Sequence, residues 1–298
     1  MAFHGTPTRR IERHLGDWMR ARLPSGLADL VMFVLKQGWS CLFGGLMLAG
    51  LIISAKVWQD EWDLARYDAL LIYAVCLQVL FVVLRLETWR EVKIIALFHL
   101  SGTLMELFKV NVGSWVYPEP ALTKLWGVPL FSGFMYASVG SYMARVIRVF
   151  DMRFTPFPPY WMTPTLALAI YVNFFSHHYV PDMRYLLFAA TVLLYLRTRV
   201  WFVASTRPLW MPMPLAALLT SGALWIAENI GTNTGTWLYA GQAQFEMVSL
   251  AKMGSWYLLL YVSFATVTLV VRDALDCPVK QSRARSTRSP EAPPTPEC

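Results

Sequence analysis

Hydrophobic residues run along the chain in eight long blocks, each separated from the next by a short polar or charged stretch. The blocks cover residues 38–57, 68–85, 92–112, 125–147, 161–177, 184–204, 209–228 and 250–271. A helix that spans a bilayer takes about 20 mostly apolar residues, and in lipid its backbone groups must bond within the helix. The pattern therefore predicts an all-α integral membrane protein with about eight transmembrane helices.

Composition supports this class. Of the 298 residues 56% are hydrophobic and 15% are charged, against about 25% charged in average soluble domains. The 13 Trp and 13 Tyr are typical of aromatic anchors at membrane interfaces. We expect the lipid bilayer as a partner, and we assign the formal charge of +7 to membrane asymmetry rather than to nucleic-acid binding.

Basic residues gather in alternate connections. They precede the first block and follow the second, fourth, sixth and eighth blocks, where they are Arg9, Arg10, Arg13, Arg20, Arg22, Lys36, Arg85, Arg90, Lys93, Arg145, Arg148, Arg153, Arg197, Arg199, Arg207, Arg272, Lys280, Arg283, Arg285 and Arg288. Since positive loops stay on the cytoplasmic side, both termini are predicted to be cytoplasmic.

The two ends of the chain differ from the blocks. Residues 1–37 form a predicted amphipathic cytoplasmic arm, with an apolar helical face made of Ile11, Leu15, Trp18 and Met19. Such a helix could lie on an anionic membrane surface or be a solvated arm. Residues 274–298 are rich in Pro, Ser and Arg, which predicts a disordered cytoplasmic tail.

A twelve-residue motif at 106–117 recurs at 228–239, with Glu, Asn, Gly, Trp and Tyr at matching positions 122 residues apart. The same offset aligns the first four blocks with the last four. We therefore expect two parallel four-helix repeats, residues 38–151 and 161–273, joined by the linker 152–160. A pseudo-twofold axis along the membrane normal would relate the repeats.

Two carboxylates inside the predicted helices are the candidate catalytic groups, Glu106 and Glu228. A charged group within a bilayer is costly and faces the helix bundle, so both are expected to face one cavity. Lys109 could pair with Glu106 at i,i+3, whereas the matched position in the second copy is Gly231. Glu228 is thus predicted to be the less neutralised acid and the better proton donor.

The other motif residues are candidates for substrate binding. Two amides near the helix ends could cap backbone groups, and four aromatic rings could form a roof over the site or serve as interface anchors; these six are Asn111, Trp115, Tyr117, Asn233, Trp237 and Tyr239. Gly113 and Gly235 would permit the turn between helix and loop.

No metal or cofactor is predicted. The four cysteines lack metal-ligand spacing, and His177, His178 and Asp182 suit a membrane interface better than a metal site. Lys252 could suggest bound retinal, but it lies at the outer edge of the last block.

The stretch Glu106-Leu-Phe-Lys-Val-Asn-Val-Gly-Ser-Trp-Val-Tyr-Pro-Glu, followed by Gly127-Val-Pro-Leu-Phe-Ser-Gly, resembles the YoaT-like family of bacterial multi-pass membrane proteins. That family has no known function. The resemblance implies a multi-pass protein of the bacterial cytoplasmic (inner) membrane.

A weaker resemblance links the Glu, the Gly-aromatic-x-Tyr turn and Gly127-Val-Pro129 to membrane carotenoid hydratases and small lycopene cyclases. It implies protonation of an isoprenoid carbon–carbon double bond by a carboxylic acid, with aromatic faces stabilising the cation. The second half departs from this pattern, because Ser249-Leu-Ala251 stands where Gly-Val-Pro is expected.

Three functions are compatible with these features. The first is an intramembrane enzyme acting on an isoprenoid or another lipid, with Glu228 as acid and Glu106 as base or cation stabiliser. The alternatives are a proton-coupled small-molecule transporter and a membrane scaffold without catalysis. The oligomeric state is left open.

Overall fold

The computed structural model describes residues 8–59, 61–205, 207–243 and 245–275. Ten α-helices occur in this part of the chain: α1 Thr8–Arg22, α2 Ser25–Ser40, α3 Leu42–Val57, α4 Arg66–Val83, α5 Trp89–Asn111, α6 Ser132–Val149, α7 Met162–Ser176, α8 Arg184–Tyr195, α9 Met213–Asn233 and α10 Leu250–Val270. The protein is mostly helical, as predicted. All but the first two residues of the predicted tail 274–298 lie outside the described residues.

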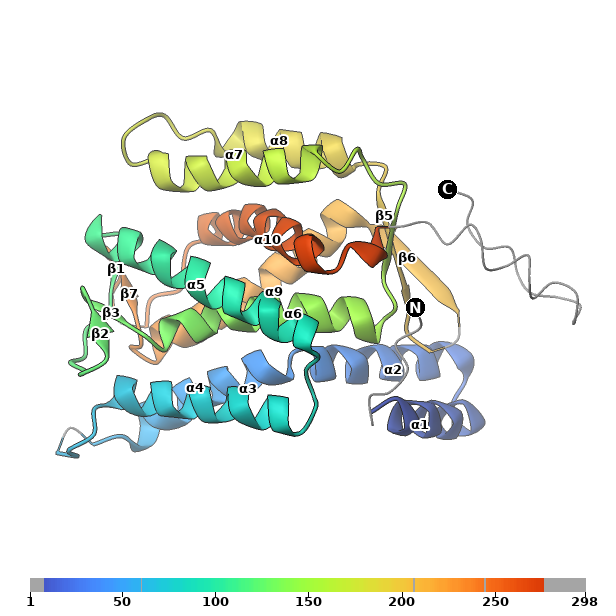
Figure 1. Cartoon of the computed structure of the whole chain (residues 1–298), viewed down its shortest axis with the longest axis horizontal. Coiled ribbons are helices and arrows are strands. Elements are labelled where there is room, and N and C mark those ends of the chain that lie inside the picture. The colour runs from blue at the N-terminus through green and yellow to red at the C-terminus, as the bar shows by residue number, and fades with distance from the viewer. Residues whose placement is uncertain (1–7, 60, 206, 244, 276–298) are drawn as a thin grey trace, which may run out of the picture.

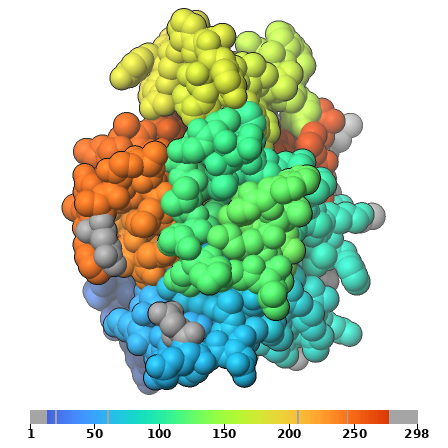
Figure 2. Space-filling model, turned by 90° about the vertical axis from the view of Figure 1, so that its left-hand side faces the viewer, coloured from blue at the N-terminus to red at the C-terminus, as the bar shows by residue number. Residues whose placement is uncertain are grey.

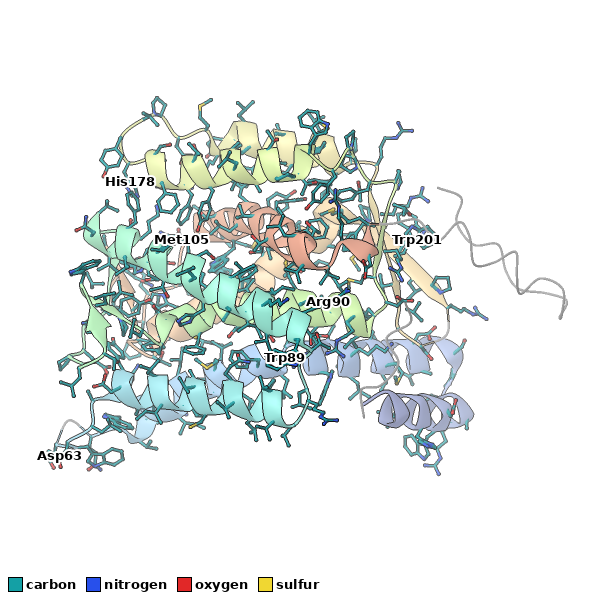
Figure 3. The ribbon with its side chains drawn as sticks, viewed as in Figure 1. Asp63, Trp89, Arg90, Met105, His178 and Trp201 are labelled. Atoms are coloured by element: carbon teal, nitrogen blue, oxygen red, sulfur yellow. The ribbon has the colours of Figure 1, made fainter. Side chains whose placement is uncertain are left out.

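The helices run roughly along the long axis of the molecule (Figure 1). Helices α7 and α8 lie on one side and α1 to α4 on the other, with α5, α6, α9 and α10 between them. Both motif copies lie at one end, which we call the motif end; Figure 2 looks onto it. Asp63 and His178 are also at the motif end, whereas Trp201 is at the opposite end (Figure 3).

Fewer helices qualify as membrane spans than the sequence predicts. By length and composition three described helices can cross a membrane, α4, α9 and α10, or four if the pair α2 and α3, bent by 65°, is one span. Helices α7 and α8 are apolar but have 15 and 12 residues, hence rises of about 22 and 18 Å against a core of about 30 Å. The apolar helices agree with a membrane protein, and eight spans stay a prediction.

Short strands interrupt the predicted all-α pattern. They are β1 Trp115–Val116, β2 Lys124–Leu125, β3 Val128–Pro129, β4 Arg153–Thr155, β5 Arg199–Val203, β6 Pro208–Pro212 and β7 Leu238–Tyr239. Strands β4, β5 and β6 form an antiparallel sheet at the end opposite the motifs, in which Trp201 pairs with Trp210. The predicted sixth block, 184–204, therefore divides into α8 and β5.

The start of α6 also differs from the prediction. The fourth block was expected to be helical from residue 125, but β2 and β3 form a hairpin there and α6 begins at Ser132. Trp126 and Gly127 have φ of 46° and 84°, the left-handed region that a tight hairpin turn requires. Pro129 therefore lies in β3, before the helix begins.

Helices α5 and α6 pack closely through small residues. A Cβ atom added to Gly133 would lie 2.6 Å from the His99 ring, and one added to Gly140 would lie 2.7 Å from Phe98. Ala137 and Ser141 are buried on the same helix. Residues 133, 137 and 141 thus form a helix-packing face of α6, because small side chains let two helices approach each other closely.

A buried ion pair joins the α4–α5 connection to α6. Glu87 Oε1 lies 3.0 Å from Arg145 Nη2, and both side chains are fully buried. Ser141 Oγ donates to Glu87 Oε1 at 2.9 Å and Gln78 Nε2 donates to Glu87 Oε2 at 2.6 Å. Both carboxylate oxygens are therefore bonded, whereas the buried Arg145 Nε has no hydrogen-bond partner. Such a pair stabilises the fold most when every polar atom is bonded.

We expect Arg145→Met to lower the free energy of unfolding by about 3–5 kcal/mol, because it leaves a buried carboxylate unpaired. The double variant Glu87→Leu/Arg145→Met should lose clearly less. Unfolding of the detergent-solubilised protein, followed by tryptophan fluorescence, measures both. The control is Arg90→Ala, whose pair with Asp273 is 52% and 63% exposed and should cost at most about 1 kcal/mol. An Arg145→Met variant as stable as this control would contradict the expectation.

Candidate functional site: two carboxylates in one cavity

Helices α5 and α9 end in the same way, so each delivers its motif to the motif end. Ser114 N donates to Lys109 O at 2.9 Å, and the equivalent backbone bond closes α9. Gly113 and Gly235, which follow these helices, have φ of +72° and +66°. A left-handed residue here lets the last carbonyls of a helix find donors. The predicted role of both glycines is confirmed.

Three side chains hold the carboxylate of Glu106. Trp115 Nε1 donates to Oε2 at 2.8 Å, Tyr117 OH donates to Oε2 at 2.9 Å, and Tyr136 OH donates to Oε1 at 2.6 Å. Glu106 is buried. We call Glu106, Trp115 and Tyr117 the first clamp; Tyr136, from α6, adds a donor that the motif does not contain.

The second copy repeats this arrangement around Glu228. Tyr239 OH donates to Glu228 Oε2 at 2.6 Å, and Trp237 Nε1 donates to the same oxygen at 3.4 Å. Each donor stands at the same distance along the chain from its glutamate as in the first clamp. We call Glu228, Trp237 and Tyr239 the second clamp. Glu228 is half-buried, so it is less enclosed than Glu106.

The two clamps touch through strands β1 and β7. The strands pair antiparallel with Trp115 opposite Tyr239 and Val116 opposite Leu238. The Trp115 and Tyr239 rings are 5.8 Å apart between centroids, and the Tyr117 and Trp237 rings are 6.5 Å apart. The tryptophan ring of each clamp therefore contacts the tyrosine ring of the other clamp. A local twofold axis through the Val116–Leu238 pair relates these two contacts.

Both clamp tyrosines remain hydrogen-bond donors. Burial and the charge of Glu106 hold the pKa of Tyr117 well above its ordinary value, and burial and the charge of Glu228 do the same for the pKa of Tyr239. Phenols with raised pKa stay protonated near neutral pH. Each one therefore offers its O–H to the carboxylate beside it.

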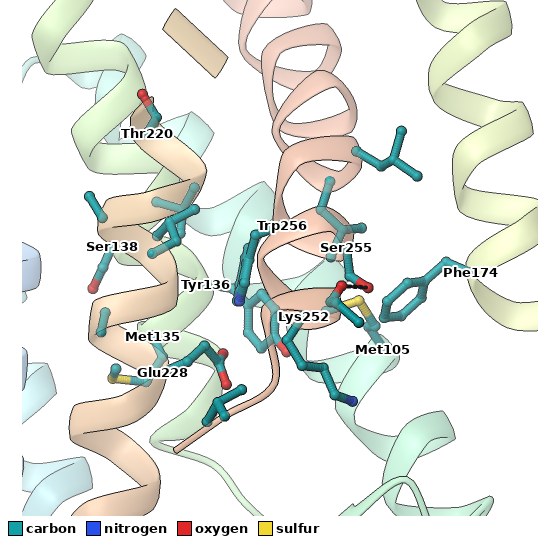
Figure 4. A pocket seen from close by; sticks show the side chains of 18 of the residues that line it. Met105, Met135, Tyr136, Ser138, Phe174, Thr220, Glu228, Lys252, Ser255 and Trp256 are labelled. Atoms are coloured by element: carbon teal, nitrogen blue, oxygen red, sulfur yellow. Dashed lines mark hydrogen bonds between the residues drawn. The ribbon is translucent and has the colours of Figure 1, made fainter. Parts of the chain in front are cut away.

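Glu106 and Glu228 line one cavity of about 1080 Å³ (Figure 4). The clamp aromatics Trp115, Tyr117, Trp237 and Tyr239 line it as well. Away from the clamps its walls are largely apolar, and they are contributed by several elements: Phe33, Val139, Ile170, Phe188, Phe202, Met211, Leu219, Leu224 and Leu258. The cavity thus has a polar part at the motif end and an apolar part that continues toward β5.

The charge partners of the two glutamates differ from the prediction. Lys109 does not pair with Glu106; its Nζ donates to Phe174 O at 2.8 Å and lies 2.9 Å from His178 Nε2. The cation whose charge acts on Glu228 is Lys252 of α10, which lines the same cavity (Figure 4). The expectation that Glu228 is the carboxylate without a nearby cation is therefore wrong, because a distant helix supplies the lysine.

Two of the predicted substrate-binding residues lie outside the site. Asn111 and Asn233 are exposed, and neither is among the residues that line the cavity. Each stands in the last turn of its helix, where backbone amides already satisfy the terminal carbonyls.

Sequence reasoning missed Tyr136 and underrated Lys252. The position that matches Tyr136 in the second half is Leu258, so the repeat does not point to this tyrosine. Lys252 did carry a signal, since a basic residue within an apolar helix marks a functional site.

The histidine pair, His177 and His178, belongs to this end of the molecule. Asp182 accepts from Asn173 at 3.0 Å and pairs with Arg184 at 2.6 Å. Within the described ranges no group of three or more His, Cys, Asp or Glu side chains is placed to hold a metal ion. His178 instead borders Lys109.

Fold and site together define a helical protein with membrane-type apolar helices and a pair of clamped carboxylates in one cavity. The chain belongs to the DUF817 family, described as proteins of unknown function, which matches residues 29–264. It is 40% identical over 255 residues to the uncharacterized protein YoaT of Bacillus subtilis (strain 168), covering 85% of this chain and 96% of that protein. The predicted YoaT-like kinship is confirmed. No solved structure matches the chain.

We expect Gly231→Ala to disrupt the second clamp, because a Cβ atom there would collide with the Trp237 ring. Overpacking of this kind costs about 1–3 kcal/mol, and thermal unfolding together with tryptophan emission measures it. Gly222→Ala, on the same helix, is the matched control, since nothing lies within 4 Å of its added Cβ; alanine there should be neutral or stabilising by up to about 1 kcal/mol. Equal stabilities of the two variants would refute the packing of Trp237 on Gly231.

Proposed function

We propose that the protein is an intramembrane enzyme that acts on an isoprenoid or another lipid by proton transfer from a carboxylic acid. The observation that carries the proposal is that two glutamates, Glu106 and Glu228, line one cavity whose remaining walls are largely apolar. Intramembrane acids are costly and mark functional sites. A cavity with apolar walls and a few convergent polar groups is the usual form of a ligand site.

The two glutamates have surroundings that suit different roles. Glu228 is half-buried and points into the cavity in Figure 4, so we assign it as the acid that reaches the substrate. Glu106 is buried and held by three donors, which suits a base or a cation stabiliser. The clamp aromatics provide faces that attract a developing cation. Proton transfer of this kind requires hydrogen-bond reach to the reacting group.

The apolar part of the cavity supports a long-chain substrate. Helix α9 lines the cavity from Ala216 to Glu228, a span of twelve helical steps that rises by about 18 Å at about 1.5 Å per step. A lipid chain can occupy this length while its functional group remains at the clamps.

We also propose that helices α3 to α10 form two parallel repeats, 38–151 and 161–273, in the bacterial inner membrane with both termini cytoplasmic. Three observations support this. The two clamps match at an offset of 122 residues, the β1–β7 ladder is symmetric about Val116 and Leu238, and the basic connections α6–α7 and α8–α9 lie at the end opposite the motifs (Figure 1).

One observation favours a proton-coupled transporter as a second candidate. The cavity lining extends from Trp115 at the motif end to Phe202 in β5, near the opposite end, as a translocation route would. Paired carboxylates can couple protons to a substrate.

Deleting the gene should change the lipid or pigment profile of the cell, and wild-type protein should restore it. Glu228→Gln should fail to restore it, because the amide cannot deliver the proton although it keeps a similar size. Untargeted lipid analysis, with protein abundance measured in the same membranes, is the readout. Glu61→Gln, at an exposed position outside the cavity, should restore the profile fully.

An unchanged lipid and pigment profile in the deletion strain would contradict the proposed enzyme activity. The transporter would then be supported by proton-dependent uptake into vesicles that Glu228→Gln abolishes. Loss of abundance without loss of activity per molecule would assign a scaffold role.

The proposed orientation predicts which positions an impermeant maleimide reaches in intact spheroplasts. In a protein whose four native cysteines are replaced, Leu122→Cys, at a side chain 94% exposed in the motif-end loop, should be labelled. Trp89→Cys, 76% exposed at the start of α5, should be labelled only after permeabilisation. The reverse labelling pattern would place the motifs in the cytoplasm.

A further inference from the structure

We propose that the polar part of the cavity binds the phosphate head group of a lipid through Lys109, Lys252 and Arg184. The proposal deepens the proposed function in that it rests on a lipid occupying the apolar part of the same cavity. All three cations line the cavity together with Glu106 and Glu228. They come from three different helices, α5, α10 and α8, so only the tertiary structure gathers them.

Lys109 is a buried cation that bonds to no described carboxylate. It is 2% exposed, and although the charge of Asp182 acts on it, its hydrogen bonds are to Phe174 O and His178 Nε2. An ammonium has three donors; Phe174 O and His178 Nε2 occupy two directions at 2.8 and 2.9 Å. A buried charge without a directly bonded counter-ion is costly, and an anionic ligand in the cavity would supply one.

Lys252 extends this positive region toward the acids. Its Nζ lies 3.9 Å from the centroid of the Tyr239 ring, and the hydroxyl of that ring donates to Glu228. The positive charges of Lys252 and Arg184 act on Lys109, and like charges this close repel. An anion between them would relieve that repulsion.

The glutamates do not remove the need for an anion. Glu106 accepts from Trp115, Tyr117 and Tyr136 at its two oxygens, and Glu228 accepts from Tyr239 and Trp237 at Oε2. Neutral donors thus bond both acids. The charge of Lys252 acts on Glu228, but of the three cations only Arg184 forms an ion pair with a described carboxylate, that of Asp182. Glu246 also lines the cavity, and its carboxylate accepts from Ala243 N. Lys109 and Lys252 therefore keep ammonium donors that no described carboxylate bonds.

A phosphate group fits this set better than a neutral head group does. Lysine binds phosphate as a point charge, and arginine can add a planar pair of donors. The exposed His178 next to Lys109 places the cations at the motif end of the cavity, and the apolar walls continue inward from there. A phosphorylated lipid would thus place its head group at the cations and its first carbons beside Glu228.

Binding of three probes to the purified full-length protein in detergent tests the proposal. Farnesyl phosphate has both chain and charge, farnesol has the chain alone, and inorganic phosphate has the charge alone. We expect farnesyl phosphate to bind at least tenfold more tightly than either of the others. Lys252→Gln should remove at least tenfold of that affinity and leave farnesol binding unchanged, whereas Lys93→Gln, at an exposed position on α5, should change neither.

Lys109→Gln risks misfolding because the lysine is buried, so Arg184→Gln provides the second cation variant, with the melting temperature as a check on folding. Equal affinities for farnesol and farnesyl phosphate, or an unchanged preference in both Lys252→Gln and Arg184→Gln, would overturn the site. If inorganic phosphate binds as tightly as farnesyl phosphate, a lipid ligand would be contradicted and a free anion would be indicated as the ligand.

Glu228→Gln separates this proposal from the proposed enzyme. It should keep the tenfold preference for farnesyl phosphate, since the cations remain. If the preference for farnesyl phosphate depends on Lys252 but the deletion strain has an unchanged lipid profile, the head-group site would be supported and the proposed enzyme activity contradicted.

Discussion

The hydrogen bonds between each motif glutamate and the aromatic residues that follow its helix are the interaction on which the site depends. A carboxylate inside an apolar bundle needs donors, and the left-handed turn at Gly113 or Gly235 brings a Trp and a Tyr back onto it. The returning strands then pair with each other. One local requirement, the solvation of an acid, thus shapes both helix ends and joins the two halves of the chain.

The symmetry of these contacts is incomplete, and its departures lie where chemistry would need them. Glu106 gains a third donor from Tyr136, whereas Glu228 is near a cation from α10. The matched positions carry different residues, Leu258 and Leu130. Two acids with equal surroundings would compete for one role, whereas two acids with different surroundings can act as a proton donor and its complement.

The cavity has both apolar walls and charged side chains. Apolar walls over most of its length suit a lipid chain, and the charged side chains gather at the motif end. Membership in a family of unknown function leaves the reaction to be argued from this geometry. A substrate that is apolar along its length and polar at one end matches the distribution of residues in the cavity.

The sequence by itself determined that the chain is mostly helical with apolar helices of membrane type, that one motif occurs twice and that its glycines turn the chain, and it singled out Glu106 and Glu228 as candidates. These follow from local rules, because apolar length, helix termination and the cost of a buried acid all depend on neighbouring residues. It did not determine that residues 124–129 and 199–212 form strands, nor that Lys109 turns to Phe174. Only the tertiary structure decided that Tyr136, Lys252 and Arg184 share one cavity with the acids, since those contacts join helices that are far apart in the chain and no local pattern encodes their meeting.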